Sequence, residues 1–489
     1  MSPTNPTNIS QGLPRVNRIS PSLTLVDGVF QGGGGLGAAY IGALTVLRSK
    51  NIWFHRVAGN SAGAILASLI AAGYTDEELK YLSGPPEEAR PSTISRDPIN
   101  FMSFIDKPQI ATSTRRKTLL WQALNGTVLD ELGEITLPIV TRKEAVQAIT
   151  NALGSIPGYN VVPQPIRKTI EQTLSTSLSL LPAAQPKLKA YLPNTSNLRT
   201  KFADQLWEHF AAQNADYLKL VNLLYEGGIC EGSVLLSTIE SLLREKIKPQ
   251  HSGPVTFNDL KMELAIIAAD TTAKEMVVYA TKTHGTMSVA EAVRRSMSIP
   301  LLFQPRLAQQ PNTSQKHEIM DGGLVSNYPY WIFSGAGKRY VSFSQQDQSR
   351  PKLGFLLDQD ADAPSSWNVR PAKWLQNGRP FNPGVKKALF ETFSLNISPS
   401  EVSFDILDRM MRVIETIDRK EEHIRKATAH VVTGNLLYYE AVIPLKGFHW
   451  LDFKVNNVKD HFLAMTERGE HATMEMLKTA PLQNMAVGI

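Results

Sequence analysis

The chain has 489 residues, of which 42% are hydrophobic and 20% are charged, and its formal net charge is +6. These are ordinary globular values, and the length allows one large domain or two average ones. The single cysteine, Cys230, excludes an intramolecular disulfide and a cysteine metal cluster, and it suits a reducing cytoplasm. No apolar run is long enough for a membrane span, and the N-terminus lacks the pattern of a signal peptide.

The small positive charge would suit contact with anionic surfaces such as phospholipid headgroups or nucleic acid, but solubility alone explains it equally well. Residues 1–21 are rich in Ser, Pro, Asn and Thr, which predicts a disordered lead. A non-cleaved secretion signal would have the same composition, so a secreted effector stays an alternative to a cytoplasmic protein.

Residues 22–82 predict two consecutive strand–turn–helix units. The strands are Leu23–Phe30 and Ile52–Ala58, and each is followed by a glycine-rich turn and a helix pattern of Ala, Leu and Ile. This repetition is typical of a parallel α/β sheet.

The first turn reads GGGGLG, and two interpretations compete for it. Gly32, Gly34 and Gly37 fit the spacing G-x-G-x-x-G of dinucleotide-binding loops, but the second strand ends without the acid that would bind a ribose. The alternative is an oxyanion hole, in which consecutive glycines at a helix start expose backbone N–H groups. We therefore expect the amides of Gly33, Gly34 and Gly35 to stabilise a negatively charged oxygen.

The second turn, from Gly59 to Gly63, has the pattern G-x-S-x-G between a strand and a helix, which predicts a nucleophile elbow with Ser61 at its tip. A serine needs a base. An α/β-hydrolase would use a late histidine such as His430 or His449, but none of the ten histidines lies in a motif-like setting. Asp321 follows a predicted strand and precedes Gly322 and Gly323. It is the better candidate, with burial raising its pKa.

The remaining elements are less regular. Residues 140–247 predict a helical insert, which either packs on the sheet or forms a lid. Residues 261–281 predict two paired strands, and 288–298 a short helix capped by Ser288. Further predicted strands end at Asp321 and span 340–344 and 353–357. The C-terminal part predicts a helix over 402–430, strands near HVVTG and LLYYEAVIP, and a final helix over about 455–477.

Together these residues resemble the patatin-like phospholipases, serine acyl hydrolases that use a Ser–Asp dyad. Four blocks match the family in order: Gly32–Gly37, Gly59–Gly63, Arg295–Phe303 and Asp321–Pro329. The resemblance implies a three-layer α/β/α core with a mostly parallel sheet in residues 22–345. A helical insert at about 140–247 and an α+β part at 346–489 would be added to it. It also implies a phospholipase A that cleaves fatty-acid esters of membrane phospholipids, without metal or other cofactor and without a nucleic-acid partner.

One residue departs from the family pattern. Leu36 stands where the family usually carries Arg or Lys before the last glycine of the oxyanion loop. The backbone donors do not depend on that side chain, but the charge beside them is lost unless Arg294 or Arg295 replaces it. Leu36 therefore keeps open the alternative of a catalytically weak lipid-binding protein. An α/β-hydrolase-type esterase that uses a histidine is the other alternative.

An enzyme that acts on lipid must reach a bilayer surface. Two segments combine aromatic and basic residues, Trp367–Lys387 and Leu445–Lys454. This combination suits peripheral contact with a membrane, but the ordinary use of such residues in loops and in the core explains it as well. The resemblance includes bacterial toxins and defence effectors that stay inactive until they bind a partner. We therefore expect an activating protein or small-molecule signal, with the insert or the C-terminal part as the regulatory element.

Overall fold

The structure is a computed structural model. It describes residues 23–85, 89–106, 109–118, 215–247, 253–309, 316–342, 344–370, 438–448 and 459–480, with single residues and short stretches between 121 and 211. Contacts divide the chain into two compact units. One combines Met1–Asp106 with Glu231–Ile489, and the other is Lys107–Cys230. The first unit carries both glycine turns and Asp321.

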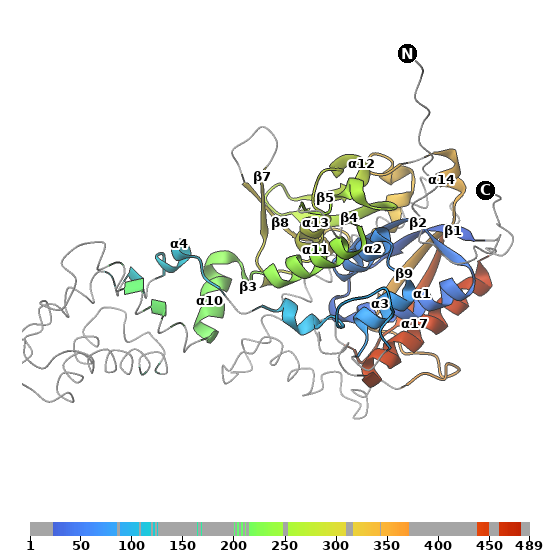
Figure 1. The fold of residues 1–489 in the computed structure, drawn as a ribbon, viewed down its shortest axis with the longest axis horizontal. Helices are drawn as coiled ribbons and strands as arrows, with labels where there is room; N and C mark the ends of the chain where they lie inside the picture. Colours follow the sequence, from blue (N-terminus) through green and yellow to red (C-terminus); the bar gives the residue numbers. More distant parts are fainter. Residues whose placement is uncertain are drawn as a thin grey trace, which may run out of the picture. The chain divides into compact units, whose positions relative to one another are not determined.

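The core of the first unit is an eight-stranded, mostly parallel sheet (Figure 1) with the order β10-β9-β1-β2-β4-β8-β7 and with β5 beside β4. The strands from β10 to β4 are parallel to their neighbours, and β5, β8 and β7 pair antiparallel. The bounds are β1 Thr24–Phe30, β2 Ile52–Asn60, β4 Glu263–Asp270, β5 Glu275–Ala280, β7 Arg306–Gln309, β8 Lys316–Asp321, β9 Lys352–Asp358 and β10 Tyr438–Pro444. The predicted α/β fold with a mostly parallel sheet is confirmed.

The central strands are buried on both faces, as parallel strands require. On one face, Val29, Ala58 and Ala265 of three adjacent strands pack against a cluster of aromatic and aliphatic residues from Tyr328 to Val341. That segment contains the short 3₁₀ helices η8 (Tyr330–Phe333) and η9 (Gly335–Gly337). Phe30, one residue on from Val29, has its ring against Tyr40 of the first helix, so the helix covers the opposite face.

The helices of the first unit include the two that the glycine turns predict, the short helix after Ser288 and the final helix of the chain. They are α1 Ala38–Ser49, α2 Ala62–Ala72, α3 Asp76–Ser83, α11 Ser233–Ile247, α12 Thr281–His284, α13 Val289–Ser296, α14 Gln345–Ser349 and α17 Lys459–Thr479. All residues of α2 are buried, which fits a sequence that is apolar all round. Thr75 caps α3 with a complete capping box through Glu78. None of the described helices is both long and apolar enough to cross a membrane.

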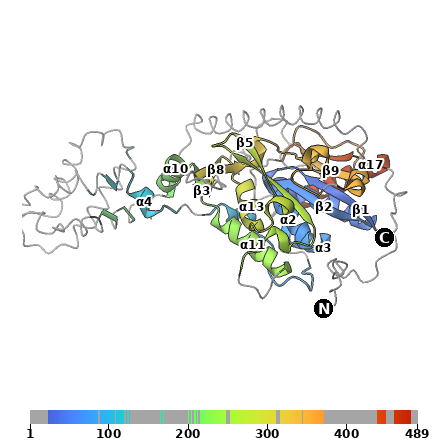
Figure 2. The same ribbon diagram turned by 90° about the horizontal axis from the view of Figure 1, so that it is seen from above.

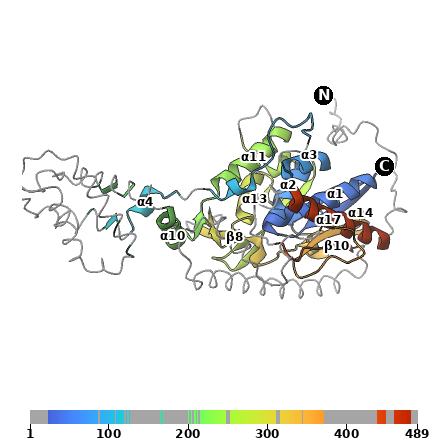
Figure 3. The same cartoon turned by 90° about the horizontal axis from the view of Figure 1, so that it is seen from below.

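The C-terminal helix α17 is built into the same unit as the glycine turns. It crosses α1 at very short range, as the red and blue helices in Figure 3 show. A Cβ at Gly42 would lie 1.9 Å from Thr466 O, and a Cβ at Gly469 would lie 1.9 Å from Ala39 O. Glycine is therefore required on both helices at the crossing. Seen from above in Figure 2, β9 runs beside β1, with α17 near it.

Most individual elements follow the sequence prediction. Strands β4 and β5 form the expected pair, and Ser288 Oγ accepts a hydrogen bond from the Glu291 amide at the start of α13. The expected strands before Asp321, at 353–357 and at LLYYEAVIP, are β8, β9 and β10, and the final helix is α17. The predicted helix over 402–430 and the strand at HVVTG lie outside the described residues.

The predicted strand at Tyr340–Ser344 is wrong in the part that the structure describes. Tyr340 N and Val341 N both donate to Gly337 O, at 2.8 and 3.2 Å, so the chain turns here. Ser344 then caps α14, its hydroxyl accepting from Asp347 N. Local turn and cap hydrogen bonds thus override the β propensity of Tyr340 and Val341.

The second unit contains α4 (Thr112–Arg115), α10 (Ala215–Glu226) and β3 (Gly228–Cys230). The indoles of Trp121 and Trp207 pack in a small cluster with Ala203 and Ala211, and Trp121 Nε1 donates to Asp204 at 2.8 Å. Most of the predicted insert at about 140–247 lies outside the described residues, and α11 at its end belongs to the first unit. A helical insert and a lid therefore stay predictions.

Candidate active site

Ser61 occupies a sharp turn between β2 and α2. Its backbone has φ 52° and ψ −125°, which is rare and strained for a residue with a side chain. The flanking glycines make the turn possible. A Cβ at Gly59 would lie 2.2 Å from Gly63 O, and a Cβ at Gly63 would lie 2.4 Å from Phe30 O. The turn therefore has the geometry that the G-x-S-x-G spacing predicts.

The end of α13 supports the serine. Ser61 N donates to Ser296 Oγ at 2.9 Å, and the Ser61 hydroxyl donates to Met297 Sδ at 3.3 Å. Ser296 Oγ lies 2.5 Å from Ile267 O and 3.2 Å from Asn60 Oδ1, two acceptors for its single hydrogen. Thioether sulfur is a weak acceptor, so the Ser61 hydroxyl is held only loosely.

Asp321 is the carboxylate at this site. It ends β8 and is only 6% exposed. Its Oδ1 accepts the Gly323 amide at 2.8 Å, whereas its buried Oδ2 has no hydrogen-bond partner in the described part of the chain. Burial raises the pKa of Asp321 to about 6. The Gly323 amide and the side chains of Ser61 and Asn60 have the opposite, smaller effect and lower this pKa.

Ser61 and Asp321 are therefore neighbours that are not hydrogen-bonded to each other. The Ser61 side chain is near enough to lower the pKa of Asp321, yet its hydroxyl points to Met297. A rotation of the hydroxyl from the sulfur to the free Oδ2 would bring the two residues into contact. The two residues are 260 positions apart in the sequence. They meet because β2, which leads to Ser61, and β8, which ends at Asp321, lie on either side of β4.

The first glycine turn lies against the serine. A Cβ at Gly32 would lie 3.0 Å from Ser61 Cβ and 2.2 Å from Asn327 Oδ1. Gly32 N donates to Asn327 O and Leu36 N donates to Gly33 O, at 2.9 and 3.0 Å. Within the described residues, the amides of Gly33, Gly34 and Gly35 donate no backbone hydrogen bond. In the described part of the chain, these three amides of the turn that begins beside Ser61 therefore have no backbone acceptor outside the helices and strands.

The other motif glycines differ in what they do. A Cβ at Gly322 would lie 2.3 Å from Asn60 Oδ1, and one at Gly323 would lie 3.0 Å from Asp321 Oδ1. Both therefore allow the close approach around the carboxylate. Gly34 has φ 51°, which favours glycine. Gly37 has open space where a Cβ would be, so close packing does not explain it.

Two asparagines join the three loops, a role that the sequence analysis missed. Asn60 Nδ2 donates to Asn327 Oδ1 at 2.9 Å, and Asn327 Nδ2 donates to Gly32 O at 3.4 Å. The serine turn, the glycine turn and the loop after Asp321 are thereby held together. Each asparagine lies inside a matched motif, at one residue before Ser61 and six after Asp321, which is the only sequence signal for them.

Leu36 is fully buried, so its side chain is part of the core and puts no charge beside the glycine turn. The two arginines considered as substitutes have other partners. Arg294 is buried and donates to Glu231 O, to Gln304 O and to Ser298 Oγ. Arg295 pairs with Glu291 at 3.0 Å and donates to Tyr279 at 3.1 Å. Both guanidinium groups are thus engaged away from the glycine turn.

The match to known proteins agrees with this arrangement. A family model described as patatin-like phospholipase matches residues 28–334, which is most of the chain. The chain belongs to the patatin-like phospholipase family. Family membership implies lipid acyl hydrolase activity in general.

The individual proteins that match this chain differ widely from it in sequence. An uncharacterized protein, YqhO of Bacillus subtilis (strain 168), is 26% identical over 338 residues, 67% of this chain and 74% of its own. VipD from Legionella pneumophila is 15% identical with TM-score 0.35, covering 93% of this chain and 67% of VipD. A structure of the ExoU–SpcU complex of Pseudomonas aeruginosa is 13% identical with TM-score 0.29, covering 98% of this chain and 61% of the other. Both TM-scores are low, so the assignment rests on the family model.

Proposed function

We propose that this patatin-like protein is a phospholipase A that cleaves fatty-acid esters of membrane phospholipids through a Ser61–Asp321 dyad. One observation carries the proposal: a strained serine lies beside a buried carboxylate whose Oδ2 has no partner among the described residues. A pKa of about 6 makes that carboxylate a better base than an ordinary aspartate and still leaves it ionised at neutral pH.

The reaction begins with proton transfer. The Ser61 hydroxyl turns from Met297 to Asp321 Oδ2, gives up its proton, and its Oγ attacks the ester carbonyl carbon. The carbonyl oxygen becomes negative and is stabilised by the free amides of Gly33, Gly34 and Gly35, each such donor being worth about 3 kcal/mol in the barrier. Asp321 then protonates the leaving lysophospholipid alcohol, and an acyl-Ser61 ester remains.

Water completes the cycle. Asp321 takes a proton from a water molecule, and the resulting hydroxide attacks the acyl carbonyl, again with the oxyanion on the glycine amides. The fatty acid leaves, and the proton returns from Asp321 to Ser61 Oγ. One residue thus acts as base and acid in both halves of the reaction, without a histidine.

Single substitutions test the dyad. Ser61→Ala and Asp321→Asn should each lower fatty-acid release from phosphatidylglycerol vesicles by about 1,000-fold or more, because nucleophile or base is lost. Ser68→Ala is the matched control, since the Ser68 hydroxyl lies on the helix that follows the serine turn and donates to Ile65 O. Full activity of folded Ser61→Ala would show that the dyad is wrong.

A histidine-dependent esterase is the less favoured candidate. Within the described residues no histidine forms a hydrogen bond with Ser61 or Asp321, while His430 and His449 lie outside them. If Asp321 is the base, His430→Ala and His449→Ala should each keep activity. The third candidate, an inert lipid-binding protein, rests on the uncharged Leu36, and it would not react with a fluorophosphonate probe for activated serines.

Membrane contact is a further part of the proposal. Leu445 and Phe448 are buried, so the described part of the second aromatic and basic segment offers no membrane anchor. Trp367, in the first segment, stacks on His471 with ring centroids 5.2 Å apart. The basic residues at 373–387 lie outside the described part and stay the proposed contact with anionic lipid. An activating protein or small-molecule signal also stays a proposal.

A further inference from the structure

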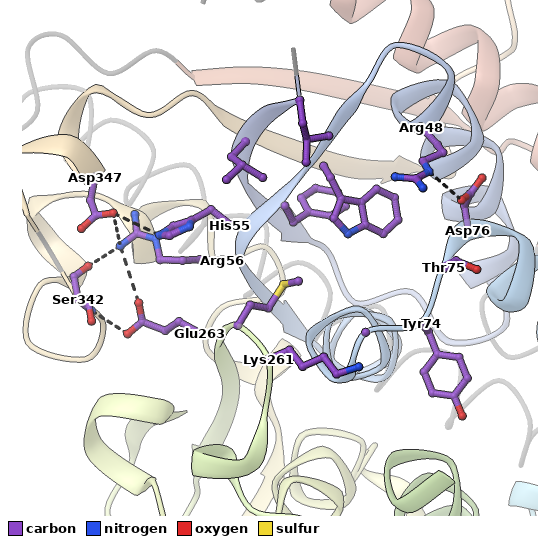
Figure 4. A pocket seen from close by; sticks show the side chains of 16 residues that line it. Arg48, His55, Arg56, Tyr74, Thr75, Asp76, Lys261, Glu263, Ser342 and Asp347 are labelled. Carbon is purple, nitrogen blue, oxygen red and sulfur yellow. Dashed lines mark hydrogen bonds and ion pairs between the residues drawn. The ribbon is translucent and has the colours of Figure 1, made fainter. Parts of the chain in front are cut away.

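A cavity of about 350 Å³ lies at the amino ends of β1, β2 and β4 (Figure 4). This volume falls within the usual range of small-molecule sites, about 300–1,000 Å³. Trp53 lines the cavity near the start of β2, and Ser61 follows the other end of that strand. At about 3.3 Å per residue, the eight positions between them span roughly 26 Å, so the cavity is separate from the candidate active site.

The wall of the cavity is largely apolar. Leu23 and Leu25 of the first strand, Trp53 and Phe54 of the second, and Met262 before the fourth line it. The two aromatic rings lie 5.4 Å apart and are tilted by 50°. Binding of an aliphatic chain or a flat ring to such a surface is favourable, because it removes apolar area from water. The gain is roughly 25 cal/mol for each Å² covered.

Two cations that line the cavity differ in how far they are neutralised. Lys261 forms no ion pair with any carboxylate among the described residues, and the nearby Glu78 is already bound by Lys246. Arg48 is paired with Asp76, its Nε lying 3.9 Å from the carboxylate, and it lies over the Trp53 ring at 5.8 Å. Figure 4 shows Arg48 beside Asp76 and apart from Lys261.

Lys261 lies directly beside the end of α2. Its backbone N donates to Ala71 O at 3.1 Å, and its side chain passes Gly73 so closely that a Cβ there would lie 2.9 Å from Nζ. Although the residue as a whole is exposed, desolvation of the ammonium, and then the charge of Lys246, hold the pKa of Lys261 below its ordinary value. An anion beside it would relieve both effects.

The opposite side of the cavity is already neutralised. Arg56 pairs with Asp27 and lies 3.8 and 4.0 Å from Asp347 and Glu263. His55 Nε2 lies 3.8 Å from Asp347. Arg56 thus lies among carboxylates, and the cation of this cavity that has no ion-pair partner in the described part of the chain is Lys261. The attraction of the cavity for an anion is therefore at Lys261.

We propose that this cavity binds an amphipathic carboxylate, with its apolar body against Trp53, Phe54 and Met262 and its carboxylate on Lys261. Ligand binding at this end of the sheet is independent of the acyl hydrolase reaction.

Isothermal titration calorimetry of the full chain tests this site. Octanoate should bind with a stoichiometry of one. Octanol, which has the alkyl chain without the carboxylate, should bind at least about tenfold more weakly. Acetate and inorganic phosphate, which lack the alkyl chain, should show no saturable binding. Lys261→Gln should weaken octanoate binding about tenfold, and Lys261→Glu should abolish it.

Control variants distinguish this cavity from binding elsewhere on the protein. Lys316→Gln removes an exposed lysine of β8 and should leave binding unchanged, as should Ser61→Ala. Lys261→Gln should leave the circular dichroism spectrum unchanged. Failure of the wild-type chain to bind octanoate, or equal binding by Lys261→Glu and the wild type, would overturn the proposal.

Discussion

Ser61 has a strained backbone and Asp321 has a buried carboxylate, and the surrounding residues maintain both of these unfavourable arrangements. The positive φ of Ser61 costs about 1–3 kcal/mol. It persists because backbone atoms pack so closely against Gly59 and Gly63 that the turn keeps this conformation. Asp321 is a carboxylate buried with one oxygen that has no partner in the described part of the chain. The stability that its protonated form contributes is fully present below about pH 3.8 and is lost as the pH rises through about 6. Strain and an unsatisfied charge at the same place are typical of reactive sites.

The pH dependence of activity follows from this carboxylate. Asp321 must be ionised to act as base, so kcat/KM should be level above about pH 6 and fall about tenfold for each pH unit below it. Initial rates on a soluble ester substrate between pH 4.5 and 8 would measure this. A profile that stays flat down to pH 4.5 would contradict the role of Asp321.

At the scale of elements, the crossing of α1 and α17 joins the first glycine turn to the C-terminal part of the chain. The Cβ positions of Gly42 and Gly469 are blocked by backbone oxygens of the opposite helix, which cannot move without displacing the helix. Since α1 begins directly after the glycine turn, the contact with α17 stabilises the first turn of α1. The sequence predicts both helices, but no local pattern in it indicates that they meet.

Substitution at this crossing should therefore be costly. Gly42→Ala should lower the free energy of unfolding by about 1–3 kcal/mol, because a methyl group forces the helices apart. Gly335→Ala is the control, since no atom lies within 4 Å of its added Cβ. Urea unfolding would measure both. An equal effect of the two variants would mean that the crossing tolerates a methyl group.

At the scale of the whole molecule, a buried ionic cluster connects distant parts of the chain. The guanidinium of Arg56 on β2 donates to Asp27 on β1 and to Ser342 O, and it lies over the ring of Phe333 at 4.7 Å. Lys352 on β9 lies 3.9 Å from Asp27, and burial lowers the pKa of Lys352 to about 8. The cluster thus fixes segments nearly 300 positions apart against the same strands.

Breaking this cluster should destabilise the first unit strongly. Arg56→Leu leaves Asp27 buried without its main partner and should cost about 3–5 kcal/mol in urea unfolding. The double variant with Asp27→Leu should recover part of that loss, because Asp27 is then no longer buried without its main partner. Arg90→Leu removes an exposed arginine paired with Asp97 and should unfold as the wild type does. Failure of the double variant to recover would point to packing rather than charge.

The sequence by itself determined the features that depend on neighbouring residues. Glycine turns, the elbow at Ser61, the strand before Asp321 and the cap at Ser288 follow from local backbone geometry and short-range hydrogen bonds, so a few positions suffice to predict them. Only the tertiary structure decided what meets across the sheet. It brought Asp321 beside Ser61, joined Asn60 to Asn327, set α17 on α1 and placed Lys261 at a cavity with no ion-pair partner among the described residues. These contacts depend on strand order and register, which pair residues hundreds of positions apart and which no local pattern records.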